Sequence, residues 1–386
     1  MRVEWSDEQE FLRDAVAGIV AREAAPTAVR EWAERADTTG ADALAVRQGW
    51  TGIGLDEESG GQGGGPLELA VLAEQLGRGA VPWDLTLASC LAAPLLARAN
   101  SEEALQLAAA TADGERVAVL AVDGRHPIAA ATRLAYHPAR SGSPIAAAAT
   151  PTEGMIRGAT SLAVADGRAS GAVRYVAGAA GAAELILLVE RGDEVELFAV
   201  AAGDATVTPR TLVDRTRSLA DIDFGDAPVR SLGTVGTDAV QRAAATAAVL
   251  VAADALGAAA RLLELTTQYV GERKQFGVPV GSFQAVKHAA AEMLVDVEAS
   301  RSAVMHGAWA VEAGEPDAAV HAAIAKVQAC GAAVRVADKA LFLHGAVGYT
   351  WEHDLQFPFK RIKSDALLFG SPDRYRDLIA GELGVA

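Results

Sequence analysis

The chain has 386 residues, 51% of them apolar, and a formal net charge of −16. This length accommodates two or three domains with a well-buried core. The negative charge argues against nucleic acid and anionic lipid as partners, because both are polyanions. No uninterrupted apolar run approaches the roughly 20 residues of a membrane span, and the charged first residues do not resemble a secretory signal. We therefore expect a cytoplasmic protein without a membrane partner.

The first part of the chain has a helical pattern. Ser6 and Gln9 have the spacing of a capping box, in which each side chain satisfies a free backbone donor at the start of a helix. Apolar residues then recur on one helical face as far as Pro26, where the helix is expected to end. We expect a second helix up to Trp50 and, after a glycine-rich loop, a third that begins at Pro66.

The pattern changes in the middle of the chain. Short apolar segments at 117–122, 173–176, 185–189 and 195–200 are separated by turn residues such as Asp123-Gly124. Short runs with frequent turns favour an all-β domain over helices.

Helical patterns return and continue to the end of the chain. Residues 243–269 are apolar on most sides of a helix, which indicates a bundle core or a subunit interface and argues against a lone monomer. Two further long helices are predicted at 282–312 and 317–343. The predicted class is therefore α+β multidomain. Its domains are a helical domain (1–114), a β-sandwich or barrel (115–232) and a four-helix bundle (233–386).

Several common kinds of site find no support in the sequence. The histidines are scattered without metal-ligand spacing to cysteine, and Cys90 and Cys330 lie among apolar neighbours, as packed thiols do. There is no nucleophile elbow of the hydrolase type and no glycine fingerprint of a nicotinamide-binding fold. We predict no metal site.

Three motifs carry a family resemblance. Residues 273–280 read RKQFGVPV and are followed by Phe283 and Gln284, residues 344–353 read HGAVGYTWEH, and residues 50–54 read WTGIG. The chain resembles the acyl-CoA dehydrogenase family, whose members carry Arg-x-Gln-Phe-Gly-x-Pro-Ile followed by Phe-Gln, and later Gly-Gly-x-Gly-Tyr-Thr-x-Glu. The order of a helical domain, a β domain and a helical bundle agrees with that family.

The resemblance implies FAD-dependent α,β-dehydrogenation of an acyl-CoA thioester, usually in a homotetramer. In the family a carboxylate removes the α-proton while the β-hydride passes to the flavin. The motif arginine reaches the FAD pyrophosphate of a neighbouring subunit and the phenylalanine packs near the adenine, roles that fall on Arg273 and Phe276. Alternatively, Arg273 only complements the dipole at the end of a long helix.

The remaining cofactor contacts implied by the resemblance cluster in the same two motifs. Phe342 stands where the family has glutamine, and Ala346 stands in place of the second glycine of the loop. The candidate cofactor-binding residues are Arg273, Gln275, Phe276, Phe283, Gln284, Phe342, Gly345, Ala346 and Gly348.

The catalytic glutamate of the family is missing. One family position lies seventeen residues after Glu352 and is occupied by Phe369; the other lies twenty-six residues before Arg273 and is occupied by Ala247. Asp365 is a weak candidate for the base, because it precedes Phe369 by one helical turn. Other acids considered for the role are Asp254, Glu352 and Asp354.

Contacts to the flavin ring within the subunit are weakened as well. No Thr-Glu-Pro-Gly-x-Gly-Ser-Asp segment follows residues 117–122, and residues 175–177 read YVA where the family has Trp-Ile-Thr. Arg215 and Arg217 match a segment of the family's β domain, although a reading as surface arginines is equally good.

The flavin-ring contacts within the subunit are thus missing, whereas Arg273 and Phe276, which serve a neighbour's cofactor in the family, are present. This combination resembles one subunit type of certain bacterial heterotetramers. In acyl-CoA dehydrogenases for sterol side chains, one subunit type supplies the base and the other completes the FAD site. The chain resembles the second type, with acyl-CoA as the substrate of the complex. Two alternatives stay open: a dehydrogenase active in a homotetramer with an unusual base, and a non-catalytic structural subunit or a relative with other flavin chemistry.

Overall fold

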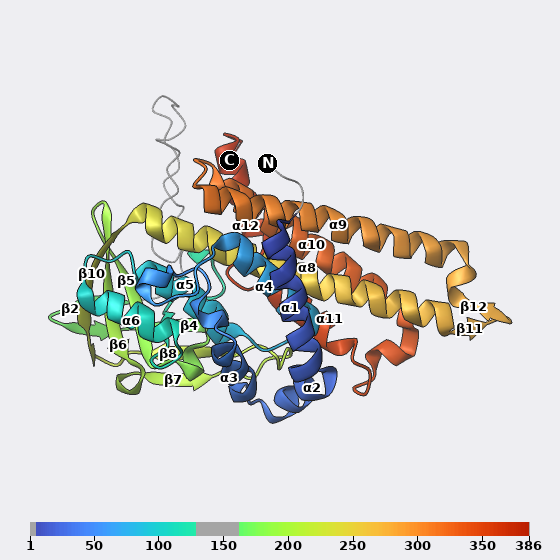
Figure 1. Cartoon of the computed structure of the whole chain (residues 1–386), viewed down its shortest axis with the longest axis horizontal. Helices are drawn as coiled ribbons and strands as arrows, with labels where there is room; N and C mark the ends of the chain where they lie inside the picture. The colour runs from blue at the N-terminus through green and yellow to red at the C-terminus, as the bar shows by residue number, and fades with distance from the viewer. Residues whose placement is uncertain (1–4, 129–161, 386) are drawn as a thin grey trace.

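The computed structural model describes residues 5–128 and 162–385. Helices occupy the first and last parts of the described chain and strands the middle, in the order that the sequence predicts (Figure 1). The predicted class is thus confirmed. The predicted boundaries at residues 114 and 232 remain predictions.

The N-terminal helices begin where the sequence signals place them. The capping box between Ser6 and Gln9 opens α1, and prolines occupy the first turns of α2 and α4. The expected single helix up to Trp50 is wrong, because Ala36 adopts a left-handed conformation with φ 51° and separates two helices. The helices are α1 (Asp7–Glu23), α2 (Pro26–Arg35), α3 (Thr39–Arg47), α4 (Pro66–Gly79), α5 (Asp84–Leu96) and α6 (Glu102–Ala112).

The middle region consists of small sheets that share an apolar core. The largest has the order β1-β5-β6-β10, and smaller ones have the orders β4-β8-β7 and β2-β3-β9. Val119, Leu187, Val176 and Ile222 belong to one buried cluster, which joins the first two sheets face to face. The strands are β1 (Ala118–Leu120), β2 (Ala163–Ala165), β3 (Arg168–Ser170), β4 (Ala172–Ala177), β5 (Glu184–Arg191), β6 (Glu194–Ala201), β7 (Thr206–Pro209), β8 (Leu219–Asp223), β9 (Ala227–Pro228) and β10 (Arg230–Gly236).

The last part is a bundle of three long helices with two short ones. The three long helices confirm those predicted from the sequence, and two short helices, α11 and α12, follow them. Figure 1 shows a small hairpin at the far end of the bundle, between α8 and α9. The elements are α8 (Thr237–Glu272), β11 (Lys274–Gln275), β12 (Val278–Pro279), α9 (Gln284–Ala313), α10 (Ala318–His344), α11 (Gln356–Asp365) and α12 (Pro372–Glu382).

Helix α8 is covered within the chain itself. It packs against α4, α9 and α10, which confirms the first of the two alternatives, a bundle core. Its apolar surface therefore gives no evidence for a second subunit. A Cβ on Gly257 would lie 1.8 Å from the backbone oxygen of Glu74, and one on Gly77 would lie 2.1 Å from that of Asp254. These glycines allow α4 and α8 to cross in close contact. By length and composition α8 could span a bilayer, but its most apolar stretch is fully buried, as in a core helix.

Candidate functional site

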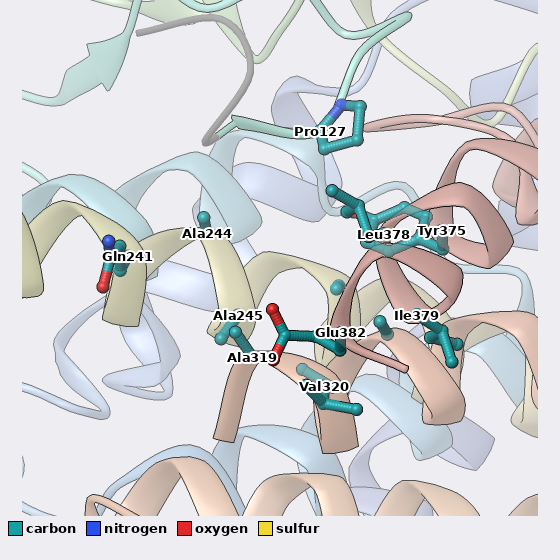
Figure 2. Close-up of a pocket in the computed structure, with 13 residues that line it drawn as sticks. Pro127, Gln241, Ala244, Ala245, Ala319, Val320, Tyr375, Leu378, Ile379 and Glu382 are labelled. Atoms are coloured by element: carbon teal, nitrogen blue, oxygen red, sulfur yellow. The ribbon is translucent and has the colours of Figure 1, made fainter. Parts of the chain in front are cut away.

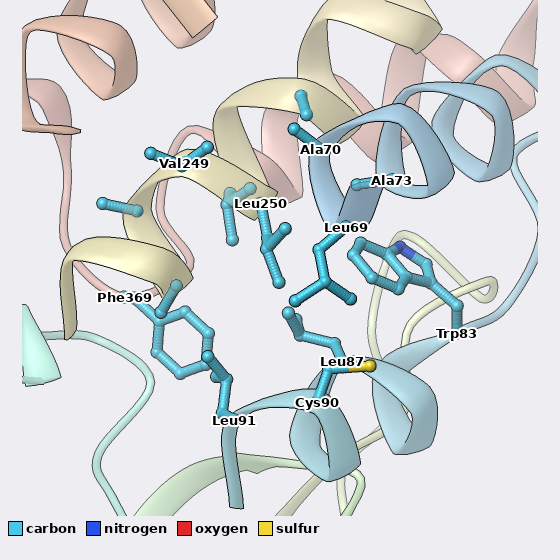
Figure 3. Packing of buried hydrophobic residues seen from close by; sticks show 14 of the residues in the cluster. Leu69, Ala70, Ala73, Trp83, Leu87, Cys90, Leu91, Val249, Leu250 and Phe369 are labelled. Carbon is cyan, nitrogen blue, oxygen red and sulfur yellow. The ribbon is translucent and has the colours of Figure 1, made fainter. Parts of the chain in front are cut away.

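Both positions of the family's catalytic glutamate lie inside the apolar core. Phe369 is 3% exposed and Ala247 is fully buried. Figure 3 shows the Phe369 ring beside Leu91 of α5 and near Leu250 of α8. The backbone holds the ring there, because Phe369 takes a left-handed conformation with φ 54° and its N–H donates to the oxygen of Gly124 at 2.6 Å. The site of the missing base is therefore filled by an aromatic ring.

Phe369→Glu should destabilise the chain rather than create a base. Removal of a buried phenylalanine costs about 3–5 kcal/mol, and an unpaired buried carboxyl adds a desolvation cost. We expect a large drop in the thermal unfolding midpoint of this variant and no acyl-CoA oxidation by the isolated chain.

Phe11→Glu is the matched control, because Phe11 is 78% exposed. Its unfolding midpoint should stay near that of the unaltered chain. A stable Phe369→Glu variant that oxidises acyl-CoA would show instead that the site is a complete active site lacking only its carboxylate.

Arg217 is the centre of a buried ion cluster. Its side chain is 1% exposed, so the reading of Arg217 as a surface arginine is wrong. Nη1 donates to Asp84 of α5 at 2.7 Å, and Nη2 donates to Asp254 of α8 at 2.5 Å and to Asp365 of α11. Arg217 thereby connects all three parts of the fold.

Arg361 is the second cation of this cluster and is also fully buried. Its Nη1 donates to Asp254 at 3.1 Å, and its Nε lies 3.5 Å from a carboxylate oxygen of Asp214. Nη2 donates to the backbone oxygen of Val81 at 2.9 Å and to the hydroxyl of Thr216 at 2.8 Å. No sequence motif marked Arg361, because its partners are distant in the chain.

These contacts remove Asp365 and Asp254 as candidates for the base. Both carboxyl groups are fully buried and paired with guanidinium groups. Asp365 therefore does not face a ligand cavity, contrary to the expectation from its helical spacing. Asp354 is likewise committed, to Arg30 at 2.7 Å, and Glu352 is exposed.

Burial raises the pKa of Asp365 to about 7, against the opposing effect of Arg217. The folded chain therefore retains a proton that the unfolded chain releases above the ordinary value of 3.8. It follows that the free energy of unfolding falls as pH rises from about 4 to about 7. Asp365→Asn should remove this contribution, which urea unfolding at several pH values within that window would measure.

Asp373→Asn serves as the control, because the Asp373 side chain is 86% exposed. In the control, the free energy of unfolding should depend on pH as it does in the unaltered chain. In the Asp365 variant, it should change less with pH. Equal pH dependence in all three proteins would contradict a retained proton at Asp365.

A cavity of about 420 Å³ lies between the middle sheets and α11–α12. Its lining includes Gly124 and Tyr175, from the two segments where the resemblance places flavin-ring contacts, and Leu368 beside the base position. The Tyr175 ring, however, already lies 4.0 Å from the guanidinium carbon of Arg210 and 5.3 Å from that of Arg125. A ring covered in this way does not fit the role of the family's Trp-Ile-Thr stacking platform.

Figure 2 shows a second cavity, between α8, α10 and α12. Its volume is about 100 Å³, and alanines such as Ala244 and Ala245 form much of its wall. Among the described residues that line it there is no lysine or arginine, and Glu382 has the one carboxylate. We assign no phosphate-binding role to this apolar cavity.

The hairpin of β11 and β12 presents its motif to solvent in the isolated chain. Phe276 is 94% exposed and touches only Phe283, edge to face at 6.3 Å, among the rings of the described residues. The Arg273 side chain makes no hydrogen bond or ion pair within the described part of the chain, and its backbone N–H rather than its side chain caps α8. Gln275 and Gln284 are exposed beside them.

The glycine loop lies at the same end of the bundle. Tyr269, one turn before the end of α8, stacks on His344 at the end of α10 with ring centroids 4.5 Å apart. Phe342, in the last turn of α10, is 81% exposed. In the loop that follows, Gly348 is buried against His344. Gly345 and Ala346 are exposed. The two motifs thus lie at the same end of the bundle, although Gly348 supports the loop rather than facing outward.

Helix α2 fixes the far side of this loop. Arg30 donates to the backbone oxygens of Trp351 at 2.8 Å and Glu352 at 3.0 Å, and to Asp354 at 2.7 Å. No sequence motif predicts this contact, because Arg30 lies more than 300 residues away from its partners. The loop is therefore held in one position by the N-terminal helices.

Large exposed apolar groups at one end of a bundle are typical of an interaction surface. Besides Phe276 and Phe342, the loop exposes Tyr349 by 74% and Trp351 by 43%. A free guanidinium group stands beside them at Arg273. This combination suits a partner that covers apolar area and brings an anionic group.

Comparisons with known proteins agree with these motifs. The family model for the acyl-CoA dehydrogenase N-terminal domain matches residues 6–115, and that for the C-terminal domain matches residues 234–384. Acyl-CoA dehydrogenase IpdE2 of Mycolicibacterium smegmatis is 32% identical over 95% of this chain and 96% of that protein.

Two solved structures share the whole fold. The ChsE4-ChsE5 complex from Mycobacterium tuberculosis contains a chain with a TM-score of 0.81 and 26% identity, with full coverage of both chains. The Tcur3481-Tcur3483 steroid ACAD has a TM-score of 0.80 and 24% identity over 98% of each chain, which shows the shared fold.

Proposed function

The chain belongs to the acyl-CoA dehydrogenase family of oxidoreductases, and from this premise we propose that it is the subunit that completes a partner's FAD site. The partner is a second acyl-CoA dehydrogenase-like chain that supplies the catalytic glutamate. The substrate of the complex is an acyl-CoA thioester, and the complex acts in the cytoplasm.

One observation carries this proposal. The two base positions, Phe369 and Ala247, are buried in an apolar core, whereas the cofactor motif at Arg273 and Phe276 stands exposed. A chain that catalysed alone would need a carboxylate at one of the base positions, facing its own ligand cavity. The asymmetry fits a division of labour between two subunit types.

The exposed surface fits the dinucleotide part of FAD. The Arg273 guanidinium is free to form paired hydrogen bonds to phosphate oxygens, and it stays charged at any physiological pH. Phe276 offers an uncovered ring to the adenine end. Arg30 keeps the glycine loop beside them in place. When bound, FAD supplies the hydride-accepting chemistry.

A heteromeric assembly is supported by the relatives. The ChsE4-ChsE5 complex and the Tcur3481-Tcur3483 steroid ACAD each combine two different chains in their descriptions. The exposed phenylalanine and tyrosine side chains at the bundle end provide apolar area for such an assembly. We propose a heterotetramer of two copies of each chain.

The test is co-expression with a family member that carries the glutamate and whose gene lies beside the gene for this chain. We expect the two chains to co-purify and to oxidise acyl-CoA with an artificial electron acceptor. A Glu→Gln change at the partner's base should abolish turnover. Turnover by this chain alone would contradict the proposal.

A further inference from the structure

The 420 Å³ cavity of this chain is lined by cations where a flavin ring would be expected. Arg125, Arg217 and Arg374 reach its wall, and none of the described residues that line it is an aspartate or glutamate. The carboxylates that pair with Arg217 belong to Asp84, Asp254 and Asp365, which are not among the lining residues. Arg125 is paired with Asp123, and Nη1 and Nη2 of Arg217 are paired with buried carboxylates. Arg374 is therefore the one of these three cations that has no ion pair in the described structure.

Two of these arginines retain unused donors. Nη1 and Nη2 of Arg217 are engaged with carboxylates, but its Nε is buried and has no hydrogen-bond partner in the described structure. The half-buried Arg374 makes no hydrogen bond or ion pair with any described residue. Buried polar groups without a partner are costly, so such donors indicate a ligand.

Backbone and hydroxyl donors stand at the same wall. Ser371 lines the cavity and precedes α12, whose eleven residues begin at Pro372. Pro372 has no N–H, so the free backbone donors of the first turn are those of Asp373 and Arg374, and the Asp373 carboxylate pairs with Arg376. Such free N–H groups favour an anion. Ser364 of α11 adds a second hydroxyl. Proteins commonly bind phosphate groups with hydrogen bonds from arginine side chains, hydroxyl groups and the backbone N–H groups at the start of a helix.

The contacts of Tyr175 in the cavity wall also disfavour stacking of a flavin ring on it. Tyr175 holds a left-handed conformation with φ 55°, and its N–H donates to Asp221 at 3.1 Å. Arg210 donates to the same carboxylate at 2.7 Å and to the Tyr175 hydroxyl at 3.1 Å. Of the two arginines on the Tyr175 ring, Arg125 lines the cavity, so a flavin ring stacked on Tyr175 from that side would have to displace the Arg125 contact.

We propose that this cavity is an anion site that binds a phosphate or pyrophosphate group in place of a flavin ring. The group belongs either to a free anion or to the nucleotide end of a CoA molecule, which carries both kinds of phosphate. This site lies within one chain, so the proposal does not depend on a partner subunit.

The experiment titrates the isolated full-length chain with inorganic pyrophosphate by calorimetry, at constant ionic strength. We expect binding of one equivalent in the unaltered chain. Arg374→Gln should weaken it by about tenfold or more, because a charge-assisted hydrogen bond is lost. The control is Arg376→Gln on the same helix, whose side chain is 55% exposed and pairs with Asp373; its binding should be unchanged.

A competition experiment, in which free CoA is added to the chain with pyrophosphate bound, then shows whether the phosphate group comes from CoA or from a free anion. Displacement of pyrophosphate by CoA supports a CoA phosphate, and no displacement supports a free anion. The proposal is overturned if pyrophosphate does not bind, if Arg374→Gln binds as tightly as the unaltered chain, or if one equivalent of FAD occupies the cavity and excludes pyrophosphate. Only this last outcome would also count against the proposed function.

Discussion

Arg273→Ala in this chain should strip flavin from the heteromeric complex without unfolding either subunit. The change removes a guanidinium that pairs with phosphate oxygens, a loss of about 2–4 kcal/mol or roughly 30- to 700-fold in the Kd for FAD. The isolated chain should keep its unfolding midpoint, because the Arg273 side chain makes no hydrogen bond or ion pair in the described structure.

Phe276→Ala should act in the same direction with a smaller effect, because it removes only a ring contact. Lys287→Ala is the matched control, as Lys287 is an exposed cation on α9 outside the motif. Flavin absorbance after gel filtration would measure retention in each complex. Full retention with Arg273→Ala would show that this arginine does not hold the cofactor.

Arg361→Met should lower the free energy of unfolding by about 3–5 kcal/mol, because it leaves buried carboxylates uncompensated. Asp254 would lose a partner at 3.1 Å and Asp214 one at 3.5 Å. The backbone oxygen of Val81 would lose its donor as well. Since these groups come from all three parts of the fold, the loss should appear as a lower urea midpoint by every optical probe.

Arg215→Met is the control for Arg361. Arg215 is exposed, and its ring contact is to Trp351 at 5.7 Å. Its removal should change stability by less than about 0.5 kcal/mol. A loss below about 1 kcal/mol for Arg361→Met would contradict a structural role for the cluster.

The local part of the fold was readable from the sequence. A capping box, prolines at helix starts and the change from short apolar runs to long helical patterns each report on neighbouring residues. These signals located α1, α4, α8 and the four strands β1, β4, β5 and β6, but not the other strands of the middle region. They missed the break at Ala36, because nothing in a helical pattern forbids a single left-handed alanine.

The candidate site was only partly readable. Motif spacing identified Phe369 and Ala247 as substitutes for the base, and the structure shows that both are buried among apolar side chains. The ion cluster was not foreseen, because Arg217 meets carboxylates 133, 37 and 148 residues away along the chain. Asp365 was misplaced for the same reason: its helical spacing was right, but its long-range partner was not visible. The cofactor roles of Arg273 and Phe276 remain predictions.

The flavin content of the complex and of the isolated chain tests most directly whether this subunit donates contacts to a cofactor bound by its partner. The complex of this chain with its glutamate-bearing partner should contain one FAD for every two chains, and this chain purified alone should be colourless. The flavin released by denaturation, divided by the amount of protein chain, would give the FAD content of the complex and of the isolated chain. One FAD per chain in the complex, or a yellow isolated chain that oxidises acyl-CoA, would contradict the assignment of this subunit as a donor of cofactor contacts.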